Sequence, residues 1–237
     1  MSGRKLAPAT RAIPPFASRE AEGGLALPPE CVATLLKGAQ PLELSQGKVL
    51  FHQGQNGNDC YWLARGLLKG TVEASGGVSL VVSLYGPGEL VGRIPAIDGL
   101  PQPTTVEAVC DCRLVALHHG SFQSALETHP ELSRWLARLM GQRMRAAYGD
   151  RVATSLAVTG RVAHALLKLA MLVGEELESD RVGLSFTVSH DVLASLAGVS
   201  RESATRTLSH WRKQGVIDRS ERHPIIIFKA RLEHETV

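Results

Sequence analysis

The sequence predicts an α+β protein with three successive parts: a β-rich N-terminal half, one long helix, and a compact C-terminal unit of helices and strands. Three observations indicate this fold class. Short β-prone runs separated by glycines fill the region before residue 118, a helical period begins after Pro130, and two capped helices precede a hairpin near the carboxyl end. A chain of 237 residues is long for one domain and suits two.

The composition is that of a globular protein with a sizeable core, since 44% of the residues are hydrophobic and 21% are charged. No stretch approaches the roughly 20 uncharged apolar residues of a membrane helix, and residues 1–24 lack the apolar centre of a signal peptide. We therefore expect a cytoplasmic protein without a membrane partner. Four cysteines are too few for a disulfide scaffold and are expected as thiols. The net charge of +3 does not by itself indicate a nucleic-acid partner.

The β-rich part is expected over residues 25–128, after a tail of residues 1–24 that is assigned no fold. The runs interpreted as strands are 48–52, 61–63, 79–84, 105–109 and 113–117. Glycines between these runs allow the positive φ angles that tight turns need. Such spacing is typical of an antiparallel β-sandwich or β-roll.

The long helix is expected over residues 129–158. Its apolar residues form an i, i+4 row made of Leu132, Leu136, Met140, Met144, Tyr148, Val152 and Leu156. Each four-residue step turns the row by about 40°, so the row cannot face a single partner. A helix that is apolar on two sides can pack against its own sheet and against a second copy, which predicts a homodimer. A helix buried within one monomer is the alternative. Gly141 and Gly149 are interpreted as marks of close helix approach.

The C-terminal unit is expected over residues 159–237 and has the pattern of a winged helix-turn-helix. A helix over 161–173 leads through an acidic loop at 175–180 and a short strand at 184–187 to two more helices and a hairpin around His223 and Pro224. Ser189 can cap the first of these two helices, which ends at Gly198. Ser200 can cap the second, which spans residues 201–213.

The second helix has a polar and an apolar side. Arg201, Glu202, Thr205, Arg206 and Ser209 fall on one face, whereas Ala204, Thr207, Leu208 and Trp211 fall on the other. Arginine matches guanine in the major groove and a carboxylate can accept from cytosine, so this face has the chemistry of base recognition. Basic residues that could contact phosphates flank it, namely Arg212, Lys213, Arg219 and Arg222. The alternative is a solvated helix with an i, i+4 ion pair, but the preceding helix and tight turn favour DNA binding.

Two C-terminal segments carry a family resemblance. Leu156–Ala170 and Ala197–Arg206 resemble the cyclic-AMP receptor protein and FNR superfamily (Crp/Fnr family) of bacterial transcription regulators, and Phe51–Gly54, Tyr61–Gly66 and Pro87–Gly92 are similar to that family's β-roll. The resemblance spans residues 42–228. It implies an α+β fold with a cyclic-nucleotide-binding-like, effector-sensing β-roll, a dimerisation helix and a winged helix-turn-helix that binds double-stranded DNA at palindromic sites with TGA-containing half-sites. For an activator it also implies RNA polymerase as a partner.

The resemblance also assigns site residues. The DNA-binding residues are Ser189, His190, Ser200, Arg201, Glu202, Ser203, Thr205, Arg206 and Arg222. The effector pocket comprises Gly92, Arg93, Ile94, Gln102, Thr104, Ala146 and Ala147.

This pocket lacks the polar groups that the cyclic-AMP type of the family uses. Gly92–Arg93–Ile94 stands in place of Gly-Glu-Leu, Gln102–Pro103 in place of Arg-Ser, and Ala146–Ala147 in place of Thr-Ser. Each lost hydrogen bond to a charged or buried group costs about 1–3 kcal/mol, which argues against cyclic AMP in the usual mode. We expect another effector or constitutive activity. Arg93 would suit a different anionic ligand, and a cyclic dinucleotide stays open.

Other cofactors have less support. An iron–sulfur cluster needs several cysteines, yet residues 1–39 contain only Cys31. Haem stays open because His52, His118 or His119 could ligate iron, although a lone histidine is more often structural. Cys110, Cys112 and His118 would point to the same side of a continuous strand. Such a strand would separate Cys110 from His118 by about 26 Å, so no metal site is expected. Cys110 and Cys112, placed on one strand, are poorly oriented for a disulfide.

No enzyme is expected. Ser189–His190–Asp191 contains the residue types of a catalytic triad, but consecutive helix positions diverge by 100° and cannot form a relay. Phosphate-loop, HExxH and nucleophile-elbow signatures are absent from the sequence. The remaining alternative is a ligand-sensing signalling module that acts through protein partners instead of DNA.

Overall fold

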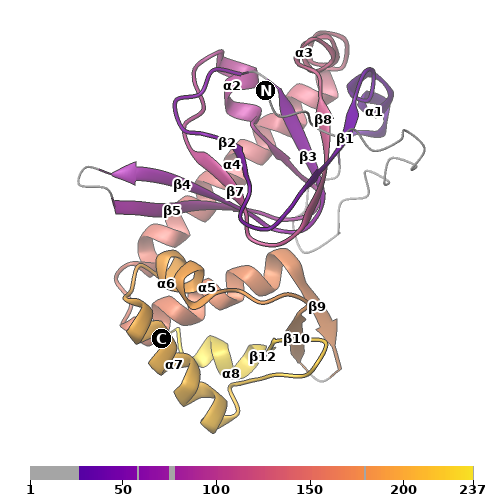
Figure 1. Ribbon diagram of the computed structural model, residues 1–237. Coiled ribbons are helices and arrows are strands. Elements are labelled where there is room, and N and C mark those ends of the chain that lie inside the picture. Colours follow the sequence, from indigo (N-terminus) through magenta and orange to yellow (C-terminus); the bar gives the residue numbers. More distant parts are fainter. Residues whose placement is uncertain (1–26, 58, 75–77, 179, 237) are drawn as a thin grey trace.

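The structure is a computed structural model that describes residues 27–57, 59–74, 78–178, 180–236, so the predicted tail of residues 1–24 lies outside the described part. Figure 1 shows a β-roll above a smaller helical unit, with one long helix running from the first toward the second. The predicted α+β class, with an antiparallel roll and a winged helix-turn-helix, is confirmed.

The roll consists of two four-stranded antiparallel sheets. One has the order β1 (Gln40–Leu44), β8 (Cys112–Leu117), β3 (Cys60–Arg65), β6 (Glu89–Val91). The other has the order β2 (Val49–Phe51), β7 (Thr105–Ala108), β4 (Leu68–Ala74), β5 (Val78–Tyr85). All five predicted runs overlap strands, but β1, β4 and β6 were not predicted. β1 contains Pro41 and β4 contains Gly70, two residue types that weaken a strand pattern.

Two apolar clusters hold the roll together. Between the sheets lie Phe51, Leu63, Leu68, Val106 and Leu114. On the outer side, α1 (Pro29–Leu35), α3 (His119–Thr128) and the start of the long helix α4 (Pro130–Ala153) cover the sheet that contains β3. α2 (Arg93–Asp98) follows Gly92, whose φ is +77° and where an added Cβ would lie 2.9 Å from the carbonyl oxygen of Asp59. Only glycine fits this turn.

The apolar row of α4 divides into a buried and an exposed half. Leu132 and Leu136 are buried in the roll, whereas Met144, Tyr148 and Val152 are 56%, 62% and 69% exposed. The helix ends at Ala153, so the predicted continuation to residue 158 is wrong. The hydroxyls of Thr154 and Ser155 donate to the carbonyls of Arg151 and Val152, each three residues earlier, and such local bonds compete with further helix.

The C-terminal unit begins with α5 (Val158–Val173) and ends with α8 (Lys229–His234), a short helix that was not predicted. Its sheet has the order β11 (Ile217–Asp218), β12 (Ile225–Phe228), β10 (Arg181–Leu184), β9 (Gly174–Leu177). The predicted acidic loop is partly wrong, because residues 175–177 lie on β9, which pairs with β10. The predicted strand at 184–187 is misplaced, because β10 spans residues 181–184 and shares only Leu184 with it. The predicted hairpin is formed by β11 and β12.

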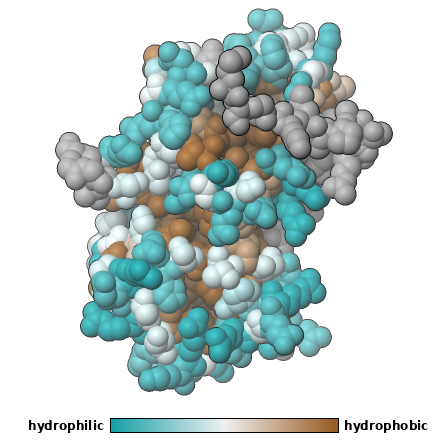
Figure 2. Space-filling model, viewed as in Figure 1, coloured by the Kyte–Doolittle hydropathy of each residue, from teal (hydrophilic) through white to brown (hydrophobic). Residues whose placement is uncertain are grey.

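One apolar cluster joins the two parts. Leu67, Leu84 and Val109 of the roll pack with residues of α5 and of the helices that follow it. A polar contact lies nearby, since Asp150 near the end of α4 bonds His164 and Lys168 of α5 at 3.0 and 2.5 Å. In Figure 2, hydrophobic residues gather toward the centre of the molecule, whereas its lower edge is mainly hydrophilic.

Candidate nucleic-acid interface and effector pocket

The helix-turn-helix forms as its capping residues predict. The Ser189 hydroxyl accepts a hydrogen bond from the Val192 N–H at 3.2 Å and begins α6 (His190–Ala197). Gly198 ends α6 with φ +60°. The Ser200 hydroxyl accepts from the Ser203 N–H at 3.1 Å and begins α7 (Arg201–Gln214). Both helices therefore start at side-chain caps, which fix their N-terminal turns.

The two faces of α7 are separated as the helical wheel predicts. Ala204, Thr207, Leu208 and Trp211 are buried, and the Thr207 hydroxyl donates to the Ser203 carbonyl at 2.9 Å. Arg201, Glu202, Arg206 and Ser209 are exposed on the other side. The buried face anchors α7 to the domain core, so the exposed polar face is presented in a fixed orientation.

The charges on the exposed face are held loosely. Arg201 lies 3.5 Å from Asp191, and both side chains are about two-thirds exposed, so this pair can exchange for other partners. The pKa of Glu202 lies below its ordinary value, because its carboxylate is hydrogen-bonded to its own backbone N–H and to Ser200, with the charges of Arg201 and Arg206 adding to the effect. Glu202 is therefore ionised at neutral pH and can only accept hydrogen bonds.

A hydrogen bond ties the two helices together beside this face. The His190 ring and the Thr205 hydroxyl lie 2.8 Å apart, one from each helix. Thr205 is only half-buried. The two predicted site residues thus position α7 against α6.

The hairpin that follows α7 carries Arg222. Its guanidinium lies 3.2 Å from the carboxylate of Glu175 on β9, which also bonds His223 at 3.2 Å. These contacts hold the pKa of Glu175 below its ordinary value, with the bond to His223 the main cause. Although Arg222 pairs with Glu175, its side chain is 78% exposed, so most of its surface faces solvent.

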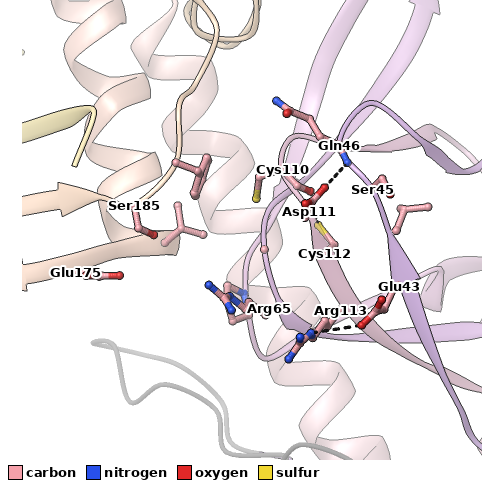
Figure 3. A pocket seen from close by; sticks show the side chains of 15 residues that line it. Glu43, Ser45, Gln46, Arg65, Cys110, Asp111, Cys112, Arg113, Glu175 and Ser185 are labelled. Atoms are coloured by element: carbon pink, nitrogen blue, oxygen red, sulfur yellow. Dashed lines mark hydrogen bonds and ion pairs between the residues drawn. The ribbon is translucent and has the colours of Figure 1, made fainter. Parts of the chain in front are cut away.

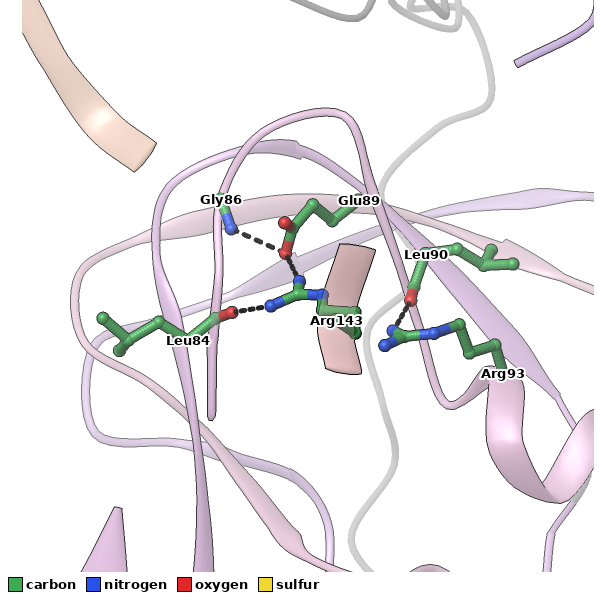
Figure 4. A network of polar contacts seen from close by, with 6 residues as sticks. All are labelled: Leu84, Gly86, Glu89, Leu90, Arg93 and Arg143. Atoms are coloured by element: carbon green, nitrogen blue, oxygen red, sulfur yellow. Dashed lines mark hydrogen bonds and ion pairs between the residues drawn. The ribbon is translucent and has the colours of Figure 1, made fainter. Parts of the chain in front are cut away.

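In the roll, the structure brings Arg93 together with a residue that sequence reasoning missed. Arg93 is 6% exposed, donates to the Leu90 carbonyl at 2.6 Å and lies 5.8 Å from the centre of the Tyr85 ring. Arg143 of α4 lies 5.3 Å from the same ring, donates to the Leu84 carbonyl at 3.1 Å and pairs with Glu89 (Figure 4). Arg143 is one of five arginines on α4, so no local signal in the sequence distinguished it.

This cluster holds more positive than negative charge. Burial lowers the pKa of Arg93, and the neighbouring Arg143 lowers it further. Burial raises the pKa of Glu89, and the two arginines counteract part of this shift. Two guanidinium groups therefore share one carboxylate in a poorly hydrated place.

The other predicted pocket residues do not all join this cluster. Gln102 is buried and holds the preceding loop, because its backbone pairs with residues 54 and 55 and its side chain donates to the Gly57 carbonyl at 3.4 Å. Thr104 is half-buried, and Ile94 is 41% exposed. Ala146 and Ala147 lie on the exposed part of α4.

The cysteine geometry differs from the expectation. Cys110 lies in the turn after β7 and Cys112 is the first residue of β8, so their placement on one strand is wrong. The two neighbouring runs were long enough to suggest a continuous strand, but the chain bends between them.

Within the described residues, no group of histidine, cysteine and carboxylate side chains could hold a metal ion. Helices of that same part are all too short or too polar to cross a membrane.

A β-roll joined by a long helix to a winged helix-turn-helix is the architecture of a DNA-binding transcription regulator. A family model described as a cyclic nucleotide-binding domain matches residues 41–129, and one described as a Crp-like helix-turn-helix domain matches residues 160–234. The chain belongs to the CRP/FNR family of transcription regulators, which are not enzymes.

Relatives match along most of their length. The cyclic AMP receptor protein of Thermus thermophilus is 33% identical over 81% of this chain and 85% of its own. The CRP-like cAMP-activated global transcriptional regulator of Mycobacterium tuberculosis is 27% identical over 86% of this chain and 91% of its own length. Among solved structures, FixK2 from Bradyrhizobium japonicum has a TM-score of 0.72 at 18% identity, covering 84% of this chain and 98% of its own, and so shares the fold. The chain is accordingly a DNA-binding regulator of a family that acts as dimers.

Proposed function

We propose that the chain is a homodimer that binds palindromic DNA with TGA-containing half-sites. The exposed polar face of α7 carries this proposal, because it offers two arginines and an ionised glutamate beside one another. Arg201 and Arg206 would each donate to a guanine edge, and Glu202 would accept from cytosine. The two copies of α7 would enter successive major grooves about 34–36 Å apart.

The residues around α7 would set its position on the duplex. Ser189, His190, Ser200 and Ser203 lie in the first turns of α6 and α7, where N–H groups and hydroxyls can contact phosphates. Arg222 would contact phosphate from the hairpin, and its exposed side chain leaves it free to reach outward. Thr205, which is bonded to His190, would fix the angle of α7 and thereby influence the outer bases.

The exposed half of α4 supports the homodimer. Met144, Tyr148 and Val152 are all more than half exposed on one face of a helix. Such a row is unfavourable in water and is the kind of surface that a second copy of the helix covers. Ala146, Ala147 and Gly149 lie in the same exposed stretch and would let two backbones approach closely.

We further propose that the effector is not cyclic AMP in the family's usual mode, or that the protein is active without one. Arg93 and Arg143 place two positive charges where a ribose-binding glutamate is expected, and Gln102 is engaged with its own loop. The excess positive charge suits an anionic ligand such as a cyclic dinucleotide. We place the protein in the cytoplasm, with RNA polymerase as a further partner if it activates transcription.

A gel-shift titration with the full-length protein tests these proposals. Duplexes carrying two TGA half-sites, with scrambled duplexes as controls, should separate by at least tenfold in affinity, and binding should weaken steeply with salt. Cyclic AMP should leave the affinity unchanged. Equal, weak binding to both duplexes would instead support a signalling module that acts through proteins, and a strong response to cyclic AMP would contradict the pocket argument.

A further inference from the structure

The turn between β7 and β8 places two thiols at the junction of the roll and the C-terminal unit. Cys110 and Cys112 both line a cleft of ≈ 860 Å³ between the two parts. On the other side of the cleft lie Glu175 of β9 and Ser185, which follows β10 (Figure 3). Val173 at the end of α5 also lines the cleft. The thiols therefore lie between the sensor and the DNA-binding domain.

The two cysteines belong to different apolar clusters. Cys110 is half-buried and packs against the cluster that joins Leu67, Leu84 and Val109 of the roll to α5. Cys112 is 3% exposed and belongs to the core between the sheets of the roll. A covalent link between the two sulfur atoms would therefore act on the contact between the domains.

The Cys112 thiol lies beside both the side chain and the backbone of Cys110. Its sulfur is 3.1 Å from the Cys110 carbonyl oxygen and 3.5 Å from the Leu67 carbonyl oxygen, and its single S–H can donate to one of them at a time. Gly66 provides the space for this sulfur, because an added Cβ would lie 2.5 Å from it. At φ +103° this position also favours glycine.

The two thiols differ in acidity. A hydrogen bond from Cys112 lowers the pKa of Cys110, and the charge of Arg65 acts in the same direction. The same hydrogen bond and burial raise the pKa of Cys112. Cys110, the more exposed of the two thiols that line the cleft, is thus the better nucleophile, and Cys112 keeps its proton.

We propose that Cys110 and Cys112 form a redox-active pair that peroxide oxidises to an intramolecular disulfide. The Cys110 thiolate attacks one peroxide oxygen, which gives a sulfenic acid and releases hydroxide. The Cys112 sulfur then gives up its proton and attacks the Cys110 sulfur, the S–S bond forms, and the sulfenic hydroxyl leaves with a proton as water. The hydroxide released first becomes the second water by taking up the proton that Cys110 lost on ionisation. Two electrons pass from the pair to the peroxide, which is reduced to two waters in total. A low-molecular-weight dithiol reverses the reaction.

Disulfide formation would change the contact between the domains. An S–S bond of about 2.05 Å requires the Cys110 sulfur to leave its apolar cluster and turn toward Cys112. The contribution of Cys110 to this cluster would then be lost, while Val109 of the same turn stays within it. The consequence for DNA binding rests on the proposed function, whereas the disulfide itself does not.

Mass spectrometry of the full-length protein after treatment with hydrogen peroxide tests the chemistry. We expect a loss of about 2 Da per chain, a fall from four free thiols to two, and full reversal by dithiothreitol. Cys110→Ser and Cys112→Ser should each abolish the loss, and Cys112→Ser should accumulate a sulfenic acid at Cys110. Cys31→Ser is the matched control, because Cys31 is fully buried and burial raises its pKa.

Two results would overturn the pair. The first is a wild-type mass that peroxide leaves unchanged, when the wild type and the cysteine variants have the same melting temperature. The second is a disulfide that still forms in Cys110→Ser. A gel shift on one duplex then compares reduced and oxidised protein, and we expect oxidation to change the affinity by about tenfold or more. An unchanged affinity after complete disulfide formation would refute the effect on domain contact. Failure of the reduced protein to bind DNA would contradict the proposed function and leave the mass result standing.

Discussion

Replacing Met144 by glutamate should split the proposed dimer. Met144 is 56% exposed in the single chain, and full burial of such a side chain is worth roughly 1.5–3 kcal/mol, so pairing adds about 1–1.5 kcal/mol per chain. The substitution removes this burial free energy from both chains, about 2–3 kcal/mol together. Such a loss weakens dimer association about 30- to 150-fold. Two glutamates facing each other add repulsion to that loss.

Sedimentation velocity across a dilution series measures this change directly. Met171→Glu is the matched control, because Met171 is 64% exposed on α5, away from the row on α4, and undergoes the same chemical change. We expect the wild type and the control to remain dimeric at concentrations where Met144→Glu is monomeric. A wild-type protein that stays monomeric, or a Met144→Glu variant that associates as tightly as the control, would refute the argument from the exposed row.

The remaining predictions concern DNA recognition and two polar clusters. Arg206→Ala should cost about 1–3 kcal/mol and relax the preference at one base pair in a competition gel shift, and equal losses on specific and random duplexes would contradict this role. Arg222→Ala should weaken all duplexes alike and flatten the salt dependence. Arg143→Met leaves Glu89 without its cation and should lower the free energy of unfolding by about 2–3 kcal/mol in urea titrations, a loss that shrinks as the pH falls and the carboxyl is protonated. Burial alone would raise the pKa of Asp150, but its two hydrogen bonds hold the pKa below 3.8. Its stabilising contribution is thus complete above that pH and lost below it, so Asp150→Asn should cost about 0.5–1 kcal/mol at neutral pH and nothing in strong acid.

The helix-turn-helix could be predicted closely because its signals are local. Caps at Ser189 and Ser200, a glycine at the turn and one apolar face fix two short helices without knowledge of the rest of the chain. The wheel positions of Ala204 and Trp211 became buried positions for the same reason. Local rules also placed the five β-prone runs that lie between glycine-containing turns.

Contacts between distant segments could not be predicted. Arg143 and Glu89 are 54 positions apart, and neither has a neighbour in the sequence that indicates the other. Cys110 was placed on a strand because the residues on both sides are β-prone, while the bend depends on how β7 and β8 join different sheets. β9 was interpreted as a loop since its glutamates are polar, yet pairing with β10 orders them. In each case tertiary packing overrides the local pattern.

Asp150 has a mechanical consequence. Its two oxygens bond residues that are one helical turn apart on α5, so the joint between α4 and α5 resists rotation as well as bending. With a single contact, α4 could rotate about its axis without moving α5. With two contacts one helical turn apart, rotation of α4 moves α5 as well. A small twist applied to α4 would therefore be passed to α5 and to the helices α6 and α7 that pack against it.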